Sequence, residues 1–136
     1  LLGLFPGQRV LEVGAGCGYN AALLGQLVSH VITIERHEKL AELARRNLKK
    51  IGISNVTVIS GDGKFGHQEG APYERIIITA AAREIPFDLK QQLTIEGLML
   101  SPVGQSHGCE MLRMRKISPR NFQSSTHGLF SFVPLV

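Results

Sequence analysis

Cysteines and long apolar runs are both scarce in this sequence of 136 residues. Its two cysteines, Cys17 and Cys109, are too few for a disulfide framework, so we expect reduced thiols and a cytoplasmic protein. A helix that spans a bilayer needs about 20 apolar residues, and the longest apolar-rich stretch, residues 76–82, is far shorter. The first residues also lack the basic, apolar and small-residue order of a signal peptide. No membrane partner is expected.

Charge gives only weak information about partners. Hydrophobic residues make up 43% and charged residues 19% of the chain, a balance typical of a globular protein. The net charge of +4 would suit an RNA substrate. However, the basic residues are scattered, apart from clusters within residues 45–50 and 113–116. We interpret these clusters as solvated faces, and a nucleic-acid partner is not expected.

Hydrophobic periodicity divides the chain into alternating strands and helices. Short β-branched or apolar runs bounded by glycine, proline or polar residues predict strands over 8–13, 30–35, 55–59, 73–79, 98–100, 110–117 and 128–133. Helical spacing predicts helices over 19–28, 38–51 and 87–93, the second closed by Gly52 as a C-terminal cap.

The order of these elements predicts an α/β fold. Alternating strands and helices form a mostly parallel sheet with helices on both faces and right-handed crossovers. The last two strands have no helix between them, so we expect them to close one edge, one of them antiparallel. In such a sheet, ligands bind outside the carboxyl ends of the strands.

A glycine-rich loop follows the first predicted strand. Gly14, Gly16 and Gly18 form a G-x-G-x-G pattern between that strand and a helix. Glycine allows a sharp turn and the close approach of a ligand where a Cβ would collide, and the first amides of the helix can donate to a polar group. The alternative interpretation is a tight structural turn, because such turns are common.

Two acidic residues favour a nucleoside site. Glu35 ends the second strand, 21 positions after Gly14, where a carboxylate can accept from both ribose hydroxyls. Asp62 ends the third strand and suits an adenine amino group. Either residue alone could be a turn carboxylate that accepts from nearby amides. Together, at successive strand ends, they indicate a nucleoside cofactor.

Two further residues favour S-adenosylmethionine over a dinucleotide. The dinucleotide pattern G-x-G-x-x-G/A needs a small last residue for close helix–strand packing beside a pyrophosphate, and Tyr19 stands there instead. Glu12, just before the loop, is suitable for the methionine ammonium and would be poorly placed beside a pyrophosphate.

The chain resembles the bacterial protein-L-isoaspartate O-methyltransferases along its whole length. The segment from Val10 to Leu24 looks like their first motif. Further similar segments follow in the same order, at residues 33–36, 61–63, 71–82, 102–104 and 132–135. The Gly-Tyr-Asn-Ala-Ala-Leu run and the block from Ala-Pro-Tyr to Thr-Ala-Ala-Ala are more specific than any general methyltransferase motif.

The resemblance implies a Rossmann-like class I methyltransferase fold and a role in protein repair. Such an enzyme methylates the free α-carboxylate of an L-isoaspartyl residue with S-adenosylmethionine. By position, Glu12 would hold the methionine end of the cofactor, Glu35 the ribose, and Asp62 with Gly63 the adenine. Thr79 and Ala80 would line the floor near the transferred methyl. A Ser/Thr-containing segment of the family precedes the first strand, upstream of Leu1, so no catalytic residue is identified.

Two other functions remain open, a methyltransferase acting on RNA or a small molecule and a truncated, inactive cofactor-binding domain. We expect residues 1–136 to form one S-adenosylmethionine-binding domain that lacks its N-terminal part. The expected partners are isoaspartyl-containing proteins or peptides. The five histidines lie far apart without metal-ligand spacing, so no metal is expected.

Overall fold

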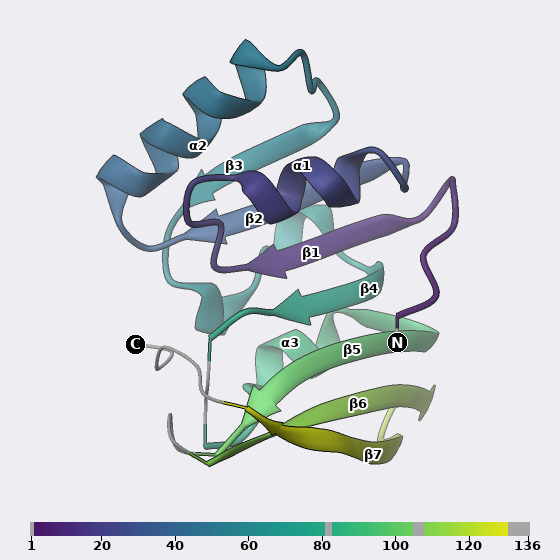
Figure 1. Cartoon of the computed structure of the whole chain (residues 1–136). Helices are drawn as coiled ribbons and strands as arrows, with labels where there is room; N and C mark the ends of the chain where they lie inside the picture. The colour runs from purple at the N-terminus through teal and green to yellow at the C-terminus, as the bar shows by residue number, and fades with distance from the viewer. Residues whose placement is uncertain (1, 81–82, 105–107, 131–136) are drawn as a thin grey trace.

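The computed structural model of the chain is built on one seven-stranded sheet (Figure 1). The structure describes residues 2–80, 83–104 and 108–130. The strands are β1 (Arg9–Val13), β2 (His30–Glu35), β3 (Val56–Ser60), β4 (Tyr73–Ile78), β5 (Leu93–Val103), β6 (Cys109–Ser118) and β7 (Asn121–Phe130). The helices are α1 (Tyr19–Gly25), α2 (Glu38–Lys50) and α3 (Phe87–Gln91), with short 3-10 turns η1 (Gly63–Phe65) and η2 (Gln68–Gly70).

The strand order confirms the predicted sheet. Neighbouring strands follow the order β3-β2-β1-β4-β5-β6-β7, and β1 to β5 pair in parallel. β6 pairs antiparallel with both β5 and β7, so it alone runs against the other strands. The sheet is therefore mostly parallel with antiparallel pairing at one edge, as expected from the missing helix between the last two strands.

The order of the strands reverses between β1 and β4. From β1 the chain builds outward through β2 to β3, and it then returns to the other side of β1 to add β4. The loops that follow β1 and β4 therefore diverge at the carboxyl ends of two adjacent strands. This is the position where ligands bind in open α/β sheets.

Helices cover both faces of the sheet (Figure 1). On one face, Val10 of β1 and Val31 of β2 form a core cluster with apolar side chains of α1. On the opposite face, Leu11 of β1 and Ile76 of β4 pack with Leu89 of α3. Successive residues of β1 thus enter different cores, because side chains of a strand alternate between its two faces.

The second helix forms around a stripe of small and aliphatic residues. Ala41, Ala44 and Leu48 are buried at helical spacing against the sheet. Ile51, included in the predicted stripe, is instead 61% exposed at the end of the helix. Gly52 has a φ of 78°, which confirms it as the residue that ends α2. Among the described residues, no helix is long and apolar enough to cross a membrane.

Several predicted boundaries are wrong, including the ends of α3, at Gln91 rather than residue 93, and of β5, at Val103 rather than residue 100. α1 ends at Gly25 rather than at residue 28, and β5 begins at Leu93 rather than at Leu98. Leu93 pairs with Tyr73 and Leu98 with Arg75, so residues 94–97 bulge out of the ladder, where the alternation of apolar residues is lost.

The last strand was predicted over 128–133, and in the structure β7 spans Asn121–Phe130. Its polar first half pairs with β6 through the backbone, which requires no apolar side chains. Residues 131–133 of the predicted strand lie outside the described residues.

Lys116 of β6 is buried against the junction of α3 and β5. Its side chain is 6% exposed, and Nζ donates to the carbonyl oxygens of Lys90 at 3.1 Å and Leu93 at 3.0 Å. The last carbonyls of a helix have no partner within it. The ammonium group satisfies these carbonyls and ties β6 to the end of α3.

We predict that Lys116→Met lowers the free energy of unfolding by about 1–3 kcal/mol, because buried carbonyls lose their donor while the apolar stem is largely kept. Urea unfolding measures the change. The matched control is Lys49→Met on the exposed surface of α2, for which a change within about 0.5 kcal/mol is expected. Equal effects of the two substitutions would contradict this role.

Candidate functional site

The glycine loop, residues 14–18, joins β1 to α1 at the point where the strand order reverses. Gly14, Gly16 and Gly18 have φ values of 103°, 54° and 90°, a region that other residues rarely adopt. A Cβ on Gly14 would lie 2.3 Å from Oγ1 of Thr79, and one on Gly18 would lie 3.2 Å from Cα of Ala44. A Cβ on Gly16 would meet nothing within 4 Å. The loop is therefore packed against protein at both ends and open at its centre.

Glu35, the last residue of β2, holds the centre of this loop. Its carboxylate is almost buried and accepts from the Gly16 amide at 2.8 Å and from the His37 amide at 3.0 Å. An ionised carboxylate has about four acceptor positions, so the two amides leave capacity for a ligand. Binding of ribose by Glu35 stays a prediction. Glu35 also supports the loop, a role that its spacing in the sequence did not indicate.

Thr79, which follows β4, braces the start of the loop. Its amide donates to the Val13 carbonyl at 3.0 Å, and Oγ1 lies 2.8 Å from that oxygen and 3.0 Å from the Gly14 carbonyl. The hydroxyl therefore donates to the backbone of the loop. Its predicted position near the transferred methyl is not tested, but its contacts indicate a supporting role.

Glu12 is completely buried beneath the loop. Its two carboxylate oxygens accept from Asn20 Nδ2 at 2.7 Å and from Thr33 Oγ1 at 2.5 Å. Burial raises the pKa of Glu12, the two hydrogen bonds lower it, and the nearby charge of Glu35 raises it further, with a net upward shift. The carboxylate is thus held in place entirely by side chains of the protein.

Sequence reasoning missed Asn20 and Thr33. Thr33 pairs with Glu12 in the parallel register of β1 and β2, so both side chains lie on the same face of the sheet. Aligning the two predicted strands in parallel would have revealed this pair. Because a carboxylate only accepts, the amide nitrogen of Asn20 faces Glu12. Its oxygen has no hydrogen bond to any described residue and is available to a ligand.

Asp62 and Gly63 follow β3 and approach the same strand ends. One oxygen of Asp62 accepts from the Lys64 amide at 3.0 Å and caps η1. A Cβ on Gly63 would lie 2.2 Å from Cγ1 of Val13, so glycine is needed for this segment to pack against β1. The turn role of Asp62 is therefore present, and its role toward adenine stays a prediction.

These contacts bring the predicted residues together at one edge of the sheet. Tyr19 does not share in them, because its side chain is 71% exposed. In the described part of the chain, no group of three or more His, Cys, Asp and Glu side chains could hold a metal ion. The assembled groups are the loop amides and the carboxylates around them, which suit a polar organic ligand.

We predict that Glu12→Gln raises the free energy of unfolding at about pH 7. The folded protein binds the Glu12 proton more tightly than the unfolded chain does, so the contribution of Glu12 to stability falls as pH rises from its ordinary pKa of 4.5 through its raised folded pKa. Each unit by which the pKa of Glu12 in the folded protein exceeds that in the unfolded chain corresponds to about 1.4 kcal/mol of lost stability at high pH.

Urea unfolding of both proteins at about pH 4 and pH 7 measures the effect. The gain should shrink at the lower pH, where Glu12 is protonated in both states. Glu42→Gln on the exposed face of α2 is the control. A gain of the same size at both pH values would contradict the prediction.

Comparison with known proteins agrees with this geometry. A family model described as protein-L-isoaspartate(D-aspartate) O-methyltransferase matches residues 1–136. A protein-L-isoaspartate O-methyltransferase of Protochlamydia amoebophila is 46% identical over 132 residues, 96% of this chain and 63% of that protein. One of Methanothermobacter thermautotrophicus is 44% identical over 140 aligned positions, 100% of this chain and 64% of that protein. The chain thus spans less than two thirds of these relatives.

Solved structures are similar as well. A structure of a protein-L-isoaspartate O-methyltransferase superposes with a TM-score of 0.91 and 32% identity, over 98% of this chain and 43% of that one. A structure from Plasmodium falciparum in complex with S-adenosyl-L-homocysteine shares the fold, with a TM-score of 0.80 and 23% identity over 97% of this chain and 67% of that one. From the family model and these identities, the chain belongs to the protein-L-isoaspartate(D-aspartate) O-methyltransferase family.

Proposed function

We propose that the protein to which this chain belongs transfers a methyl group from S-adenosylmethionine to the free α-carboxylate of L-isoaspartyl residues in damaged proteins. Family membership over residues 1–136 supports this reaction. The main structural support is the hydrogen bond from the Gly16 amide to Glu35. It joins the open centre of the glycine loop to the acid that is predicted to bind ribose.

The side chains at the strand ends fit S-adenosylmethionine. Glu35 retains acceptor capacity for the ribose hydroxyls beside the open side of Gly16. The second carboxylate oxygen of Asp62 has no hydrogen bond to a described residue and suits the adenine amino group. The free amide oxygen of Asn20, backed by the charge of Glu12, suits the methionine ammonium. When bound, the cofactor supplies a methyl group activated by its sulfonium.

The acceptor needs little chemical assistance. A carboxylate is already ionised at neutral pH, so no general base has to remove a proton from it. The task of the protein is to hold the two reactants together and to exclude water. A site composed of loop amides and buried carboxylates, with no metal-ligand cluster in the described residues, is consistent with this requirement.

The remaining parts of the proposal concern organisation and location. Residues 1–136 form one S-adenosylmethionine-binding domain that carries the cofactor side of the site. The partners are isoaspartyl-containing proteins or peptides and not nucleic acid. The cytoplasm is the proposed location, because the two cysteines are too few for the disulfide framework typical of small secreted domains.

We predict that Glu35→Gln weakens binding of S-adenosylhomocysteine by about 10- to 100-fold, because a hydrogen bond to a charged group contributes about 1.5–3 kcal/mol. Isothermal titration calorimetry measures the affinity. Glu38→Gln is the matched control, since Glu38 is exposed at the start of α2, and its partners are Ser60 and Arg45, the latter at 3.4 Å. Unchanged affinity in Glu35→Gln would remove Glu35 from the cofactor site.

We also predict transfer of labelled methyl groups to an isoaspartyl peptide and none to the same peptide with normal aspartate. RNA serves as the third acceptor. Methyl transfer to RNA alone, with binding that weakens steeply with salt, would overturn the proposed substrate. Binding of S-adenosylhomocysteine without transfer to any acceptor would indicate that residues 1–136 bind the cofactor without turnover.

A further inference from the structure

The sheet face that carries Glu12 continues well beyond the helices that cover β1 to β3. A single row of paired residues crosses it from Glu12 through Ile77 and Leu100 to Arg113 and Ser125. Adjacent strands are about 4.8 Å apart, so Arg113 on β6 lies roughly 14 Å from Glu12 across the sheet. Among the described residues, α1 and α2 pack mainly over β2 and β3, and α3 packs on the opposite face with Met99 and Met114 (Figure 1).

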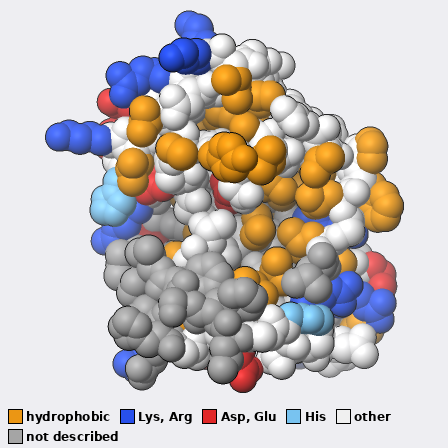
Figure 2. All heavy atoms as spheres, viewed as in Figure 1, with side chains coloured by type: hydrophobic (Ala, Val, Ile, Leu, Met, Phe, Trp, Pro, Cys, Tyr) orange, Lys and Arg blue, Asp and Glu red, His pale blue; other side chains and the backbone are white. Residues whose placement is uncertain are grey.

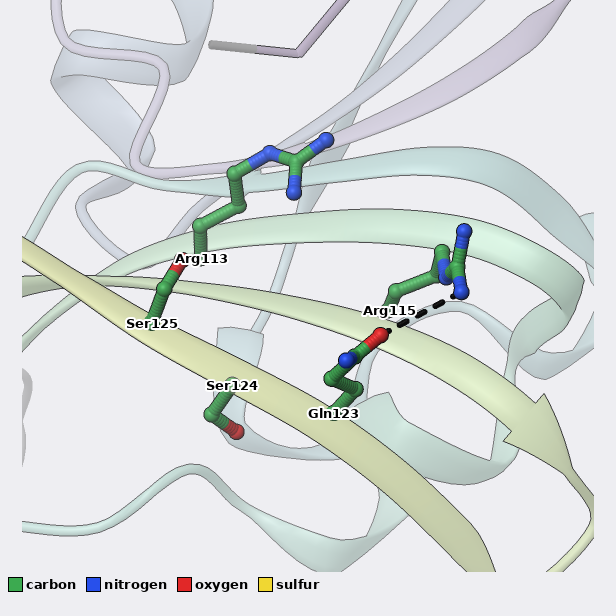
Figure 3. A pocket seen from close by; sticks show the side chains of 5 residues that line it. All are labelled: Arg113, Arg115, Gln123, Ser124 and Ser125. Carbon is green, nitrogen blue, oxygen red and sulfur yellow. Dashed lines mark hydrogen bonds between the residues drawn. The ribbon is translucent and has the colours of Figure 1, made fainter.

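A second arginine lies beside the first. Arg113 and Arg115 are two residues apart on β6, so both project from this face, while Met114 between them is buried on the other. Figure 3 shows both arginines on the same side of the strands as Gln123 and Ser125 of β7, while the side chain of Ser124 points away from them. These five residues line a hollow of about 250 Å³. A water molecule accounts for about 30 Å³ of liquid, so the hollow accommodates a larger ligand.

The guanidinium group of Arg115 is only partly satisfied by the protein. Nη2 donates to Gln123 at 3.2 Å, and Nη1 lies 3.6 Å from the carboxylate of Glu96, which is 62% exposed. Nε is buried and has no hydrogen-bond partner among the described residues. A buried donor without an acceptor is destabilising, and the guanidinium group thus keeps donors that the described residues leave unused.

Positive charge is concentrated around the hollow. Arg75 of β4 lies in the same cross-strand row as Arg115, two strands away. Burial lowers the pKa of Arg75, the nearby Glu74 raises it, and the charge of Arg113 lowers it again, with a net downward shift. The three arginines therefore repel one another, and an anion between Arg113 and Arg115 would reduce that repulsion.

We propose that the hollow lined by Arg113 and Arg115 is a binding site for an oxyanion of the phosphate class, separate from the cofactor site. Arginine binds phosphate through several parallel N–H groups, and Ser125, which pairs with Arg113 on the same face, adds a hydroxyl that also lies 2.8 Å from Nε2 of His127. A phosphate has more acceptor oxygens than a planar carboxylate, which suits donors that come from two strands. Of residues 113–116, interpreted from the sequence as a solvated face, Lys116 is instead buried, and Arg113 and Arg115 are half-buried.

The test is a titration of the chain with inorganic phosphate at constant ionic strength. The NMR signal of the Arg115 Nε–H group monitors binding. Saturable shifts of this signal are expected, and Arg115→Gln or Arg113→Gln should weaken phosphate binding, measured by calorimetry, by about tenfold or more. Arg46→Gln on the exposed face of α2 removes the same charge away from the hollow and should leave binding unchanged.

Three results would overturn the site: no saturable binding of phosphate, an equal loss in Arg46→Gln, or acetate binding as tightly as phosphate. A phosphoserine peptide that binds more tightly than inorganic phosphate would identify a phosphorylated polypeptide as the source of the anion, and weaker binding would identify a free small anion. Melting temperature and S-adenosylhomocysteine affinity, measured for each variant, separate loss of this site from loss of the fold or of the cofactor site.

Discussion

The conformation of the glycine loop depends on hydrogen bonds from side chains at the ends of two neighbouring strands. Glu35 at the end of β2 accepts from the Gly16 amide, and Thr79 after β4 donates to the backbone where β1 ends. Both supports stand on strands that flank β1 in the sheet. The loop therefore cannot move far without disturbing hydrogen bonds that are fixed by the core. A ligand would meet loop amides that are already oriented before it binds, which reduces the ordering cost of binding.

Beneath this loop, Glu12 illustrates how a binding site can oppose stability. An ionised carboxylate is costly to bury, and the described neighbours of Glu12 supply two neutral donors rather than a cation. Carboxylates whose pKa is raised by burial are concentrated at functional sites. Under the proposed function, the ammonium group of the cofactor supplies the positive charge that the protein itself does not place there.

The two halves of one sheet face have different chemistry although the strands run continuously across them. Over β1 to β3 the face is covered by α1 and α2 and is mainly apolar, apart from the Glu12 network and the strand ends at Glu35 and Ser60. Over β5 to β7 it carries arginines and small polar side chains around a hollow. On the face of the molecule seen in Figure 2, basic and polar groups are visible together with apolar side chains. The cross-strand row from Glu12 to Arg113 connects the two halves, and these two residues lie roughly 14 Å apart across the sheet.

Local patterns in the sequence were sufficient to predict the order of the elements, the mostly parallel sheet and the glycine loop with its flanking acids. Strand and helix periods are properties of short segments, and the carboxyl ends of parallel strands necessarily share an edge. The limits of β5 and β7 were not predictable in this way. A bulge at residues 94–97 and a polar edge strand are determined by pairing with another strand, which leaves no periodic signal in the residues themselves.

The residue types and spacing by themselves indicated which groups would gather at the site, including Glu12, Glu35 and Asp62, and the family resemblance added Thr79. Only the tertiary structure decided what those groups do for the protein. Glu35 and Thr79 support the loop, and Glu12 is held by Asn20 and Thr33, because hydrogen bonds depend on which atoms of distant segments approach within about 3 Å. The same holds for Arg113 and Arg115, whose two-residue spacing suggested a solvated face. Their hollow exists because β7 folds back beside β6 and contributes the rest of its lining.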